Sequence, residues 1–267
     1  MYELYWGLKE KPFENTPNPR FIYFSSDHLE AISRLTYAVE ERKGAALLTG
    51  DYGCGKTVIS RLLFEKLTPD KYETALITNP LLNPMALLRE ICFQLNMKIS
   101  TRSPKTLLLK KLNERFYENM NNDKDTVIII DEAQAIQNLT AFEELRLLLN
   151  FQLNDRFLLT LILIGQPELR EKINQFKQFK QRLAIKYHLN PLNEKDTEKY
   201  IVHRLEVAKA RGEIFTPKAM RLTWEKSEGI PRVINNICDM SLLIGFTKKL
   251  DKIDRGLIAE VASDLDQ

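Results

Sequence analysis

The sequence is poor in cysteine, in long apolar runs and in net charge, and each shortage excludes a class of protein. Three cysteines occur among 267 residues, and their scattered spacing matches no metal-binding pattern, which indicates a reducing compartment rather than a disulfide framework. The longest apolar run, 158–164, is far shorter than the about 20 residues that a membrane-spanning helix needs. The N-terminus lacks a basic region followed by an apolar stretch, so we expect no signal peptide and a cytoplasmic location.

The net charge is small overall, but positive charge is locally concentrated. The formal net charge of +3 gives no general nucleic-acid signature. Between 170 and 186, however, the only acidic residue is Glu171. This stretch could form a solvated helix face, a subunit interface or a DNA contact, and the sequence leaves these alternatives open. Its cations are Arg170, Lys172, Lys177, Lys180, Arg182 and Lys186.

A glycine-rich loop follows the first apolar run of the chain, at 45–49. It has the pattern G-x-x-x-x-G-K-[ST] between an expected strand and an expected helix, which is the context that a phosphate-binding (Walker A) loop requires. Its backbone N–H groups would surround a phosphate at a helix N-terminus. Lys56 would reach the β- and γ-phosphates, and the Thr57 hydroxyl would ligate Mg²⁺. The expected nucleotide-binding residues are Gly50, Asp51, Tyr52, Gly53, Cys54, Gly55, Lys56, Thr57 and Val58.

A second motif places two carboxylates after a run of branched apolar residues at 127–130. Such a run predicts a strand buried on both faces, as in a parallel sheet. Open α/β sheets bind ligands at the carboxyl ends of their strands. Asp131 would hold the Mg²⁺ water shell (the Walker B role), and Glu132 would be the general base that activates water. Together the two motifs predict a nucleoside triphosphatase. No Asn-Lys-x-Asp guanine-reading motif is visible, so we expect ATP.

The chain alternates strand and helix up to about residue 190 and is helical afterwards. Strands are expected near 45–49, 74–78, 126–130, 158–164 and 185–189, which predicts a five-stranded parallel sheet with helices on both faces. One strand–helix unit separates the two motifs, as in the P-loop branch that has a catalytic glutamate (ASCE). Helices are expected at 193–211, 216–227, 231–248 and 254–265. The expected organisation is an aromatic N-terminal arm (1–25), an AAA+ core (26–190) and an all-helical lid (191–267).

Three further polar residues occupy positions that fit AAA+ roles. Gln166 ends the fourth strand, where a polar side chain (sensor 1) could orient the lytic water. Arg232 begins the third lid helix and could reach the phosphates (sensor 2), so that nucleotide state changes the lid angle. Arg182 precedes the fifth strand, where it could act as an arginine finger on a neighbouring subunit's γ-phosphate. Arg170 is the alternative finger. A finger acting between subunits would make turnover depend on oligomerisation.

Over nearly its whole length the chain resembles the general secretion pathway protein A (ExeA-type) ATPases. The similar segments are 7–13, 16–23, 37–44, Asp131-Glu132-Ala133-Gln134, Gly165-Gln166-Pro167-Glu168-Leu169 and 229–239 followed by 242–246. The resemblance implies an AAA+ ATPase that assembles or remodels a type II secretion or pilus-type complex of the cell envelope. It also implies a homo-oligomer and an inner-membrane or envelope partner.

The sequence departs from the full-length secretion ATPases because it shows no transmembrane helix and no peptidoglycan-binding part after the lid. Any attachment to the inner membrane is therefore expected to come from a partner. Similar ATPases serve transposons as target-DNA regulators. An ATP-dependent regulator that binds duplex DNA is accordingly the alternative function, and the basic stretch 170–186 is the feature that favours it.

Overall fold

A computed structural model describes residues 1–16 and 18–265. These residues form two compact units, each of which is discontinuous in sequence. The first, here called the helical unit, contains Met1–Asp27, Asp51–Gly55 and the residues from Asn190 onward. The second, the sheet unit, contains His28–Gly50 and Lys56–Leu189.

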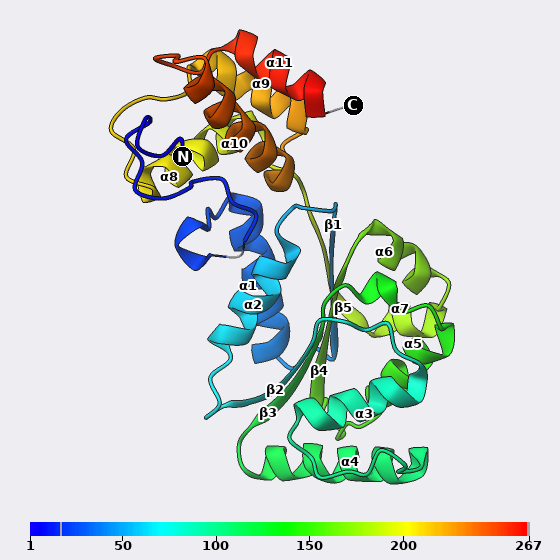
Figure 1. Cartoon of the computed structure of the whole chain (residues 1–267). Coiled ribbons are helices and arrows are strands. Elements are labelled where there is room, and N and C mark those ends of the chain that lie inside the picture. The colour runs from blue at the N-terminus through cyan, green and yellow to red at the C-terminus, as the bar shows by residue number, and fades with distance from the viewer. Residues whose placement is uncertain (17, 266–267) are drawn as a thin grey trace. The chain divides into compact units, whose positions relative to one another are not determined.

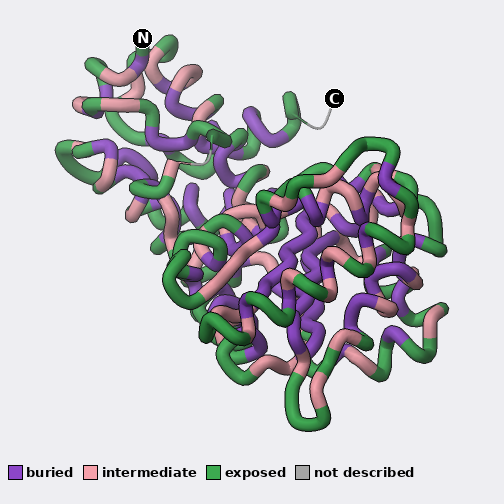
Figure 2. The backbone as a smooth tube through the Cα atoms, turned by 90° about the horizontal axis from the view of Figure 1, so that it is seen from below, coloured by how far each residue is buried: buried purple, intermediate pink, exposed green. Residues whose placement is uncertain are grey.

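The sheet unit is built on a five-stranded parallel sheet in the order β2-β3-β4-β1-β5. The expected parallel sheet is therefore confirmed. In it, β4 lies between β1 and β3, the strands that precede the two motifs. The middle strands are buried along nearly their whole length (Figure 2), which explains their continuous apolar runs. The strands are β1 (Ala45–Gly50), β2 (Tyr72–Ile77), β3 (Asp125–Ile130), β4 (Leu159–Gly165) and β5 (Leu183–Leu189).

Helices cover both faces of this sheet (Figure 1). Two helices, α1 and α2, lie on one face, and α3 to α7 lie on the other, where they form one apolar core with alternate strand residues such as Leu47 and Ile128. The helices are α1 (Ser26–Glu40), α2 (Lys56–Lys66), α3 (Pro84–Gln94), α4 (Lys105–Asn121), α5 (Leu139–Leu148), α6 (Pro167–Asn174) and α7 (Lys177–Arg182). A short 3₁₀ helix, η2 (Ala133–Ala135), follows β3.

Four helices form the C-terminal part of the helical unit, as expected from the sequence. They are α8 (Glu194–Val207), α9 (Pro217–Ser227), α10 (Pro231–Thr247) and α11 (Arg255–Leu265). The side chains of Asn193 and Thr216 cap α8 and α9 by accepting hydrogen bonds from backbone N–H groups in the first turn. One isolated parallel bridge, between Phe215 and Ile253, ties the start of α9 to the start of α11.

The N-terminal segment packs within the helical unit. The rings of Tyr2, Trp6, Phe13 and Phe21 are buried among residues of α8 to α11 in one apolar cluster. The indole nitrogen of Trp6 donates a hydrogen bond to the carbonyl of Leu242. Residues 19–21 form a short 3₁₀ helix, η1 (Pro19–Phe21), whereas Pro17 lies outside the described residues. These four rings therefore form part of the core of the helical unit.

The guanidinium group of Arg204, on α8, binds the backbone of the N-terminal segment. The side chain is 7% exposed, and its Nε and Nη2 atoms donate to the carbonyls of Pro12 (2.5 Å) and Glu14 (2.9 Å). Nη1 donates to the hydroxyl of Tyr200 at 2.7 Å. The Phe21 ring lies 5.2 Å from the guanidinium carbon, within the range of a cation–π contact. The buried charge is thus stabilised by carbonyl dipoles and aromatic faces.

We predict that Arg204→Ala destabilises the helical unit by about 2–3 kcal/mol, because the buried carbonyl of Pro12 and the part-buried carbonyl of Glu14 lose their donors. Both tryptophans, Trp6 and Trp224, lie in this unit, so the fluorescence of tryptophan reports its unfolding in urea. The matched control is Arg221→Ala, which removes only exposed ion pairs and should change the free energy of unfolding by less than about 0.5 kcal/mol. Equal effects of the two substitutions would contradict the assigned role of Arg204.

Candidate nucleotide-binding site

The glycine-rich loop joins the end of β1 to the start of α2. Gly53 and Gly55 have φ angles of 86° and 97°, a region that side chains with a Cβ rarely adopt. Lys56 is 5% exposed, and its Nζ atom donates to the carbonyl of Gly50 at 2.8 Å. Thr57 and Val58 follow in the first turn of α2, where backbone N–H groups and the helix dipole favour an anion. The local backbone therefore fits a phosphate group.

Asp131 lies directly after β3 and is buried, with 1% of its surface exposed. Its Oδ2 atom accepts a hydrogen bond of 2.9 Å from the Ser60 hydroxyl, and Oδ1 accepts one of 2.9 Å from the backbone N–H of Glu132. Because Ser60 comes four residues after Lys56, the two side chains share a face of α2. Sequence reasoning did not include Ser60, although this spacing could have indicated it.

Glu132 and Gln166 are connected through Gln134. Glu132 has a left-handed backbone (φ 52°), and its Oε2 atom accepts a hydrogen bond from the Gln134 side-chain amide. The Gln134 carbonyl oxygen, Oε1, accepts from the backbone N–H of Gln166 at 3.0 Å. Gln166 is the N-cap residue of α6, and its side chain makes no capping hydrogen bond. The structure thus brings the expected base and the expected sensor into one network, through a residue to which the sequence assigned no role.

The basic stretch 170–186 is divided between different contacts. Lys172 donates to the carbonyls of Gln134 (2.5 Å) and Ile136 (3.0 Å), so it caps η2 inside the sheet unit. Arg182 donates to Gln152 Oε1 (3.3 Å) and Asn150 Oδ1 (3.2 Å). Two of the six cations are therefore engaged within the unit instead of forming one continuous charged face.

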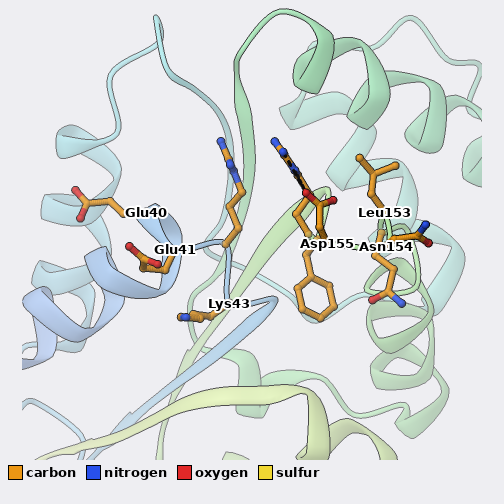
Figure 3. Close-up of a pocket in the computed structure, with 10 residues that line it drawn as sticks. Glu40, Glu41, Lys43, Leu153, Asn154 and Asp155 are labelled. Carbon is orange, nitrogen blue, oxygen red and sulfur yellow. Dashed lines mark hydrogen bonds and ion pairs between the residues drawn. The ribbon is translucent and has the colours of Figure 1, made fainter.

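Within the sheet unit, Arg182 lies near the start of β1, whereas Gly50, the first residue of the glycine-rich pattern, lies at the end of β1. Arg182 precedes Leu183, which pairs with Ala45 at the start of β1. Beside it, Gln152 and Phe157 line a cavity of about 560 Å³ (Figure 3). Arg182 is therefore separated from Gly50 of its own chain by the length of a strand, roughly 17 Å.

Arg232 contacts the phosphate loop within the helical unit. Its guanidinium carbon lies 4.6 Å from the centre of the Tyr52 ring, and Nη1 donates to the Tyr52 hydroxyl. A Cβ atom at Gly53 would come within 2.9 Å of the Arg232 Cβ. Cys54 is buried, and Asp51 also lies in this loop. The N-terminal turn of α10 therefore packs directly on loop residues 51–55.

The chemistry of the oxygen donors suits a hard cation shared with a nucleotide. No cluster of three or more His, Cys, Asp or Glu side chains in the described part of the chain could hold a metal by itself. Thr57 supplies a hydroxyl, and Asp131 supplies a buried carboxylate. Mg²⁺ is commonly bound by one or two protein oxygen ligands together with phosphates and water. These residues fit such an ion.

Among the helices described, none has the length and apolar character needed to span a membrane.

Comparisons with known proteins agree with the fold and the motifs. The AAA domain family model matches residues 39–173. General secretion pathway protein A of Aeromonas hydrophila is 39% identical over 99% of this chain, which confirms the resemblance indicated by the motifs. The chain spans only 48% of that relative.

Solved structures show the same fold at low identity. Aeropyrum pernix ORC2 in its ADPNP–ADP complexes has a TM-score of 0.67 at 16% identity and covers 96% of this chain and 71% of its own. The structure of Drosophila ORC bound to DNA has a TM-score of 0.72 at 17% identity and covers 97% of this chain and 65% of its own. The match to the AAA domain family model implies nucleotide binding in general.

We predict that Ser60→Ala raises the Mg²⁺ concentration needed for half-maximal nucleotide binding by about 10-fold or more, because Asp131 loses a hydrogen bond that orients it. Binding of a fluorescent ATP analogue across a Mg²⁺ titration measures this. The matched control is Ser33→Ala on the exposed side of α1, which should leave the titration unchanged. Identical curves for both variants would show that Ser60 does not position Asp131 for the ion.

Proposed function

The chain belongs to the AAA domain family, and we propose that it is a Mg²⁺-dependent ATPase that drives assembly or remodelling of a secretion or pilus-type complex of the cell envelope. The observation that carries the ATPase proposal is the buried Asp131 at the end of β3, hydrogen-bonded to Ser60 of the helix that begins with Lys56. The expected metal carboxylate and the helix that begins with Lys56 are thereby held together within the sheet unit.

Each proposed residue has a separate part in hydrolysis. Lys56 and the backbone of the loop bind the β- and γ-phosphates. Thr57 and Asp131 would hold Mg²⁺, which would neutralise charge on the phosphates. Glu132 accepts a proton from the attacking water, whose oxygen forms a bond to the γ-phosphorus while the bond to the β,γ-bridging oxygen breaks. Gln166 contacts the water or the γ-phosphate, and Arg232 responds to the nucleotide.

The contact between Arg232 and Tyr52 supports a sensing role for Arg232. Its guanidinium already lies against a side chain of the phosphate loop. A bound triphosphate offers this cation a stronger partner than an aromatic ring and a phenol, since hydrogen bonds between charged groups are the strong ones. We infer that nucleotide binding draws Arg232 from Tyr52 toward phosphate.

The envelope role is supported by the identity with general secretion pathway protein A, which extends over almost all of this chain. Because about half of that relative lies outside the match, its remaining functions are not carried over. We propose a homo-oligomer that works with an inner-membrane or envelope-complex protein. Such a partner would place the ATPase at the cytoplasmic side of the inner membrane.

The alternative is an ATP-dependent regulator that binds duplex DNA. It draws less support from the structure than from the sequence, because Lys172 and Arg182 make contacts within the sheet unit. ATPase rates measured with and without duplex DNA distinguish the two functions. Stimulation that disappears with rising salt would favour the alternative, because contacts to the phosphate backbone release counterions.

We predict that Lys56→Ala abolishes nucleotide binding, whereas Glu132→Gln binds nucleotide but hydrolyses it at least about 100-fold more slowly. The phosphate contact is lost in the first variant and only the proton acceptor in the second. Equilibrium binding and phosphate release, measured on the same preparations, separate these effects. Wild-type affinity in Lys56→Ala would refute the phosphate-loop assignment.

We predict that Arg182→Ala slows hydrolysis by about 10³-fold, the lower range for an arginine finger, and that mixing it with Glu132→Gln restores part of the rate. In the mixture, an intact base on one subunit meets an intact finger on the next. Arg170→Ala is the matched control and should retain the wild-type rate. Arg182 would not be the arginine finger if Arg170→Ala, and not Arg182→Ala, lost its ATPase activity and regained it on mixing with Glu132→Gln. The same conclusion would follow if no mixture regained activity.

A further inference from the structure

The side chain of Glu132 is held at one oxygen only. Among the described residues, its carboxylate makes a hydrogen bond solely to Gln134, through Oε2. Its backbone adopts a left-handed conformation, φ 52° and ψ 34°, at the start of η2, which is uncommon for a residue with a side chain. The other carboxylate oxygen, Oε1, is left to accept a proton. The orientation of this carboxylate therefore depends on Gln134.

The Gln134 amide can satisfy its two partners in one orientation only. The backbone N–H of Gln166 is a donor, so it must face the amide oxygen. The carboxylate of Glu132 accepts, so it must face the amide NH₂ group. A flipped amide would place donor against donor and acceptor against acceptor. The two hydrogen bonds thus fix the rotation of the amide without ambiguity.

Two neighbouring residues, Gly165 and Lys172, also favour this position of Gln134. Gly165 leaves room for the amide, because a Cβ atom there would lie 2.5 Å from Gln134 Oε1. The Nζ atom of Lys172 donates to the backbone carbonyl of Gln134 at 2.5 Å, which fixes the main chain of η2. Gln134 is therefore preorganised, because its main chain and its side-chain amide are both hydrogen-bonded and Gly165 leaves space for the amide.

We propose that Gln134 is a positioning residue for hydrolysis: it orients Glu132 toward the lytic water and links this base to Gln166. The inference rests on the proposed ATPase function. The amide donor holds Oε2, so that Oε1 faces the water. The amide oxygen joins the same group to the main chain of Gln166, so that a displacement of the sensor on contact with the γ-phosphate is passed to the base.

The test is Gln134→Met, which keeps the length of the side chain and removes both hydrogen bonds. We expect kcat to fall about 10- to 100-fold, the cost of a misplaced catalytic group, while KM and the affinity for a fluorescent ATP analogue change less than about 2-fold. Gln137→Met is the matched control, because Gln137 lies three residues further on and is exposed. It should retain the wild-type kcat and KM.

A double variant and a second substitution separate positioning from general damage. Adding Gln134→Met to Glu132→Gln should leave the residual single-turnover rate unchanged, because residues that act as one unit are non-additive. Gly165→Ala, whose new Cβ displaces the amide, should lower kcat in the same way and add little to Gln134→Met.

An active wild type with an equally active Gln134→Met would overturn the proposal and leave the ATPase function standing. A loss of nucleotide affinity in Gln134→Met equal to its loss of kcat would also overturn it, since that indicates a structural role. An inactive wild type, by contrast, would refute the ATPase function itself.

Discussion

A carboxylate buried at the end of a parallel strand constrains the architecture around it. Asp131 is removed from water, and a buried charge is costly unless donors satisfy it. One donor is the Ser60 hydroxyl, so α2 must cross the sheet close to the end of β3. The other is the backbone N–H of Glu132, and the chain turns there through a left-handed residue. The positions of α2 and of the turn that carries Glu132 therefore both depend on the hydrogen bonds that Asp131 accepts.

Much of the fold could be predicted because its signals are local. The apolar runs of the strands, the proline and threonine at the start of α9 and the break near 190 each depend on a few neighbouring residues. The phosphate loop is similar, since its glycines reflect backbone conformations that the loop itself requires.

Contacts between distant segments could not be predicted in the same way. Gln134 stood in a recognised motif, but its bond to Gln166 depends on how β3 and β4 lie side by side. Lys172 counted as surface charge in the sequence, whereas the structure uses it to cap a short helix. The density of aromatic residues near the N-terminus indicated a distinct arm. Only the folded chain shows that four of its rings are buried in the core among α8 to α11.

Because the helical unit is discontinuous in sequence, it cannot be completed until late in the synthesis of the chain. The rings of Trp6 and Phe13 are buried by helices that lie about 200 residues further along the chain. At roughly 5–20 residues per second of synthesis, these aromatic side chains wait about 10–40 seconds for their partners. During that interval the sheet unit can fold while the arm still exposes apolar surface. These aromatic residues are thus made long before they can be buried, and nascent chains would be most open to chaperones or to self-association at this segment.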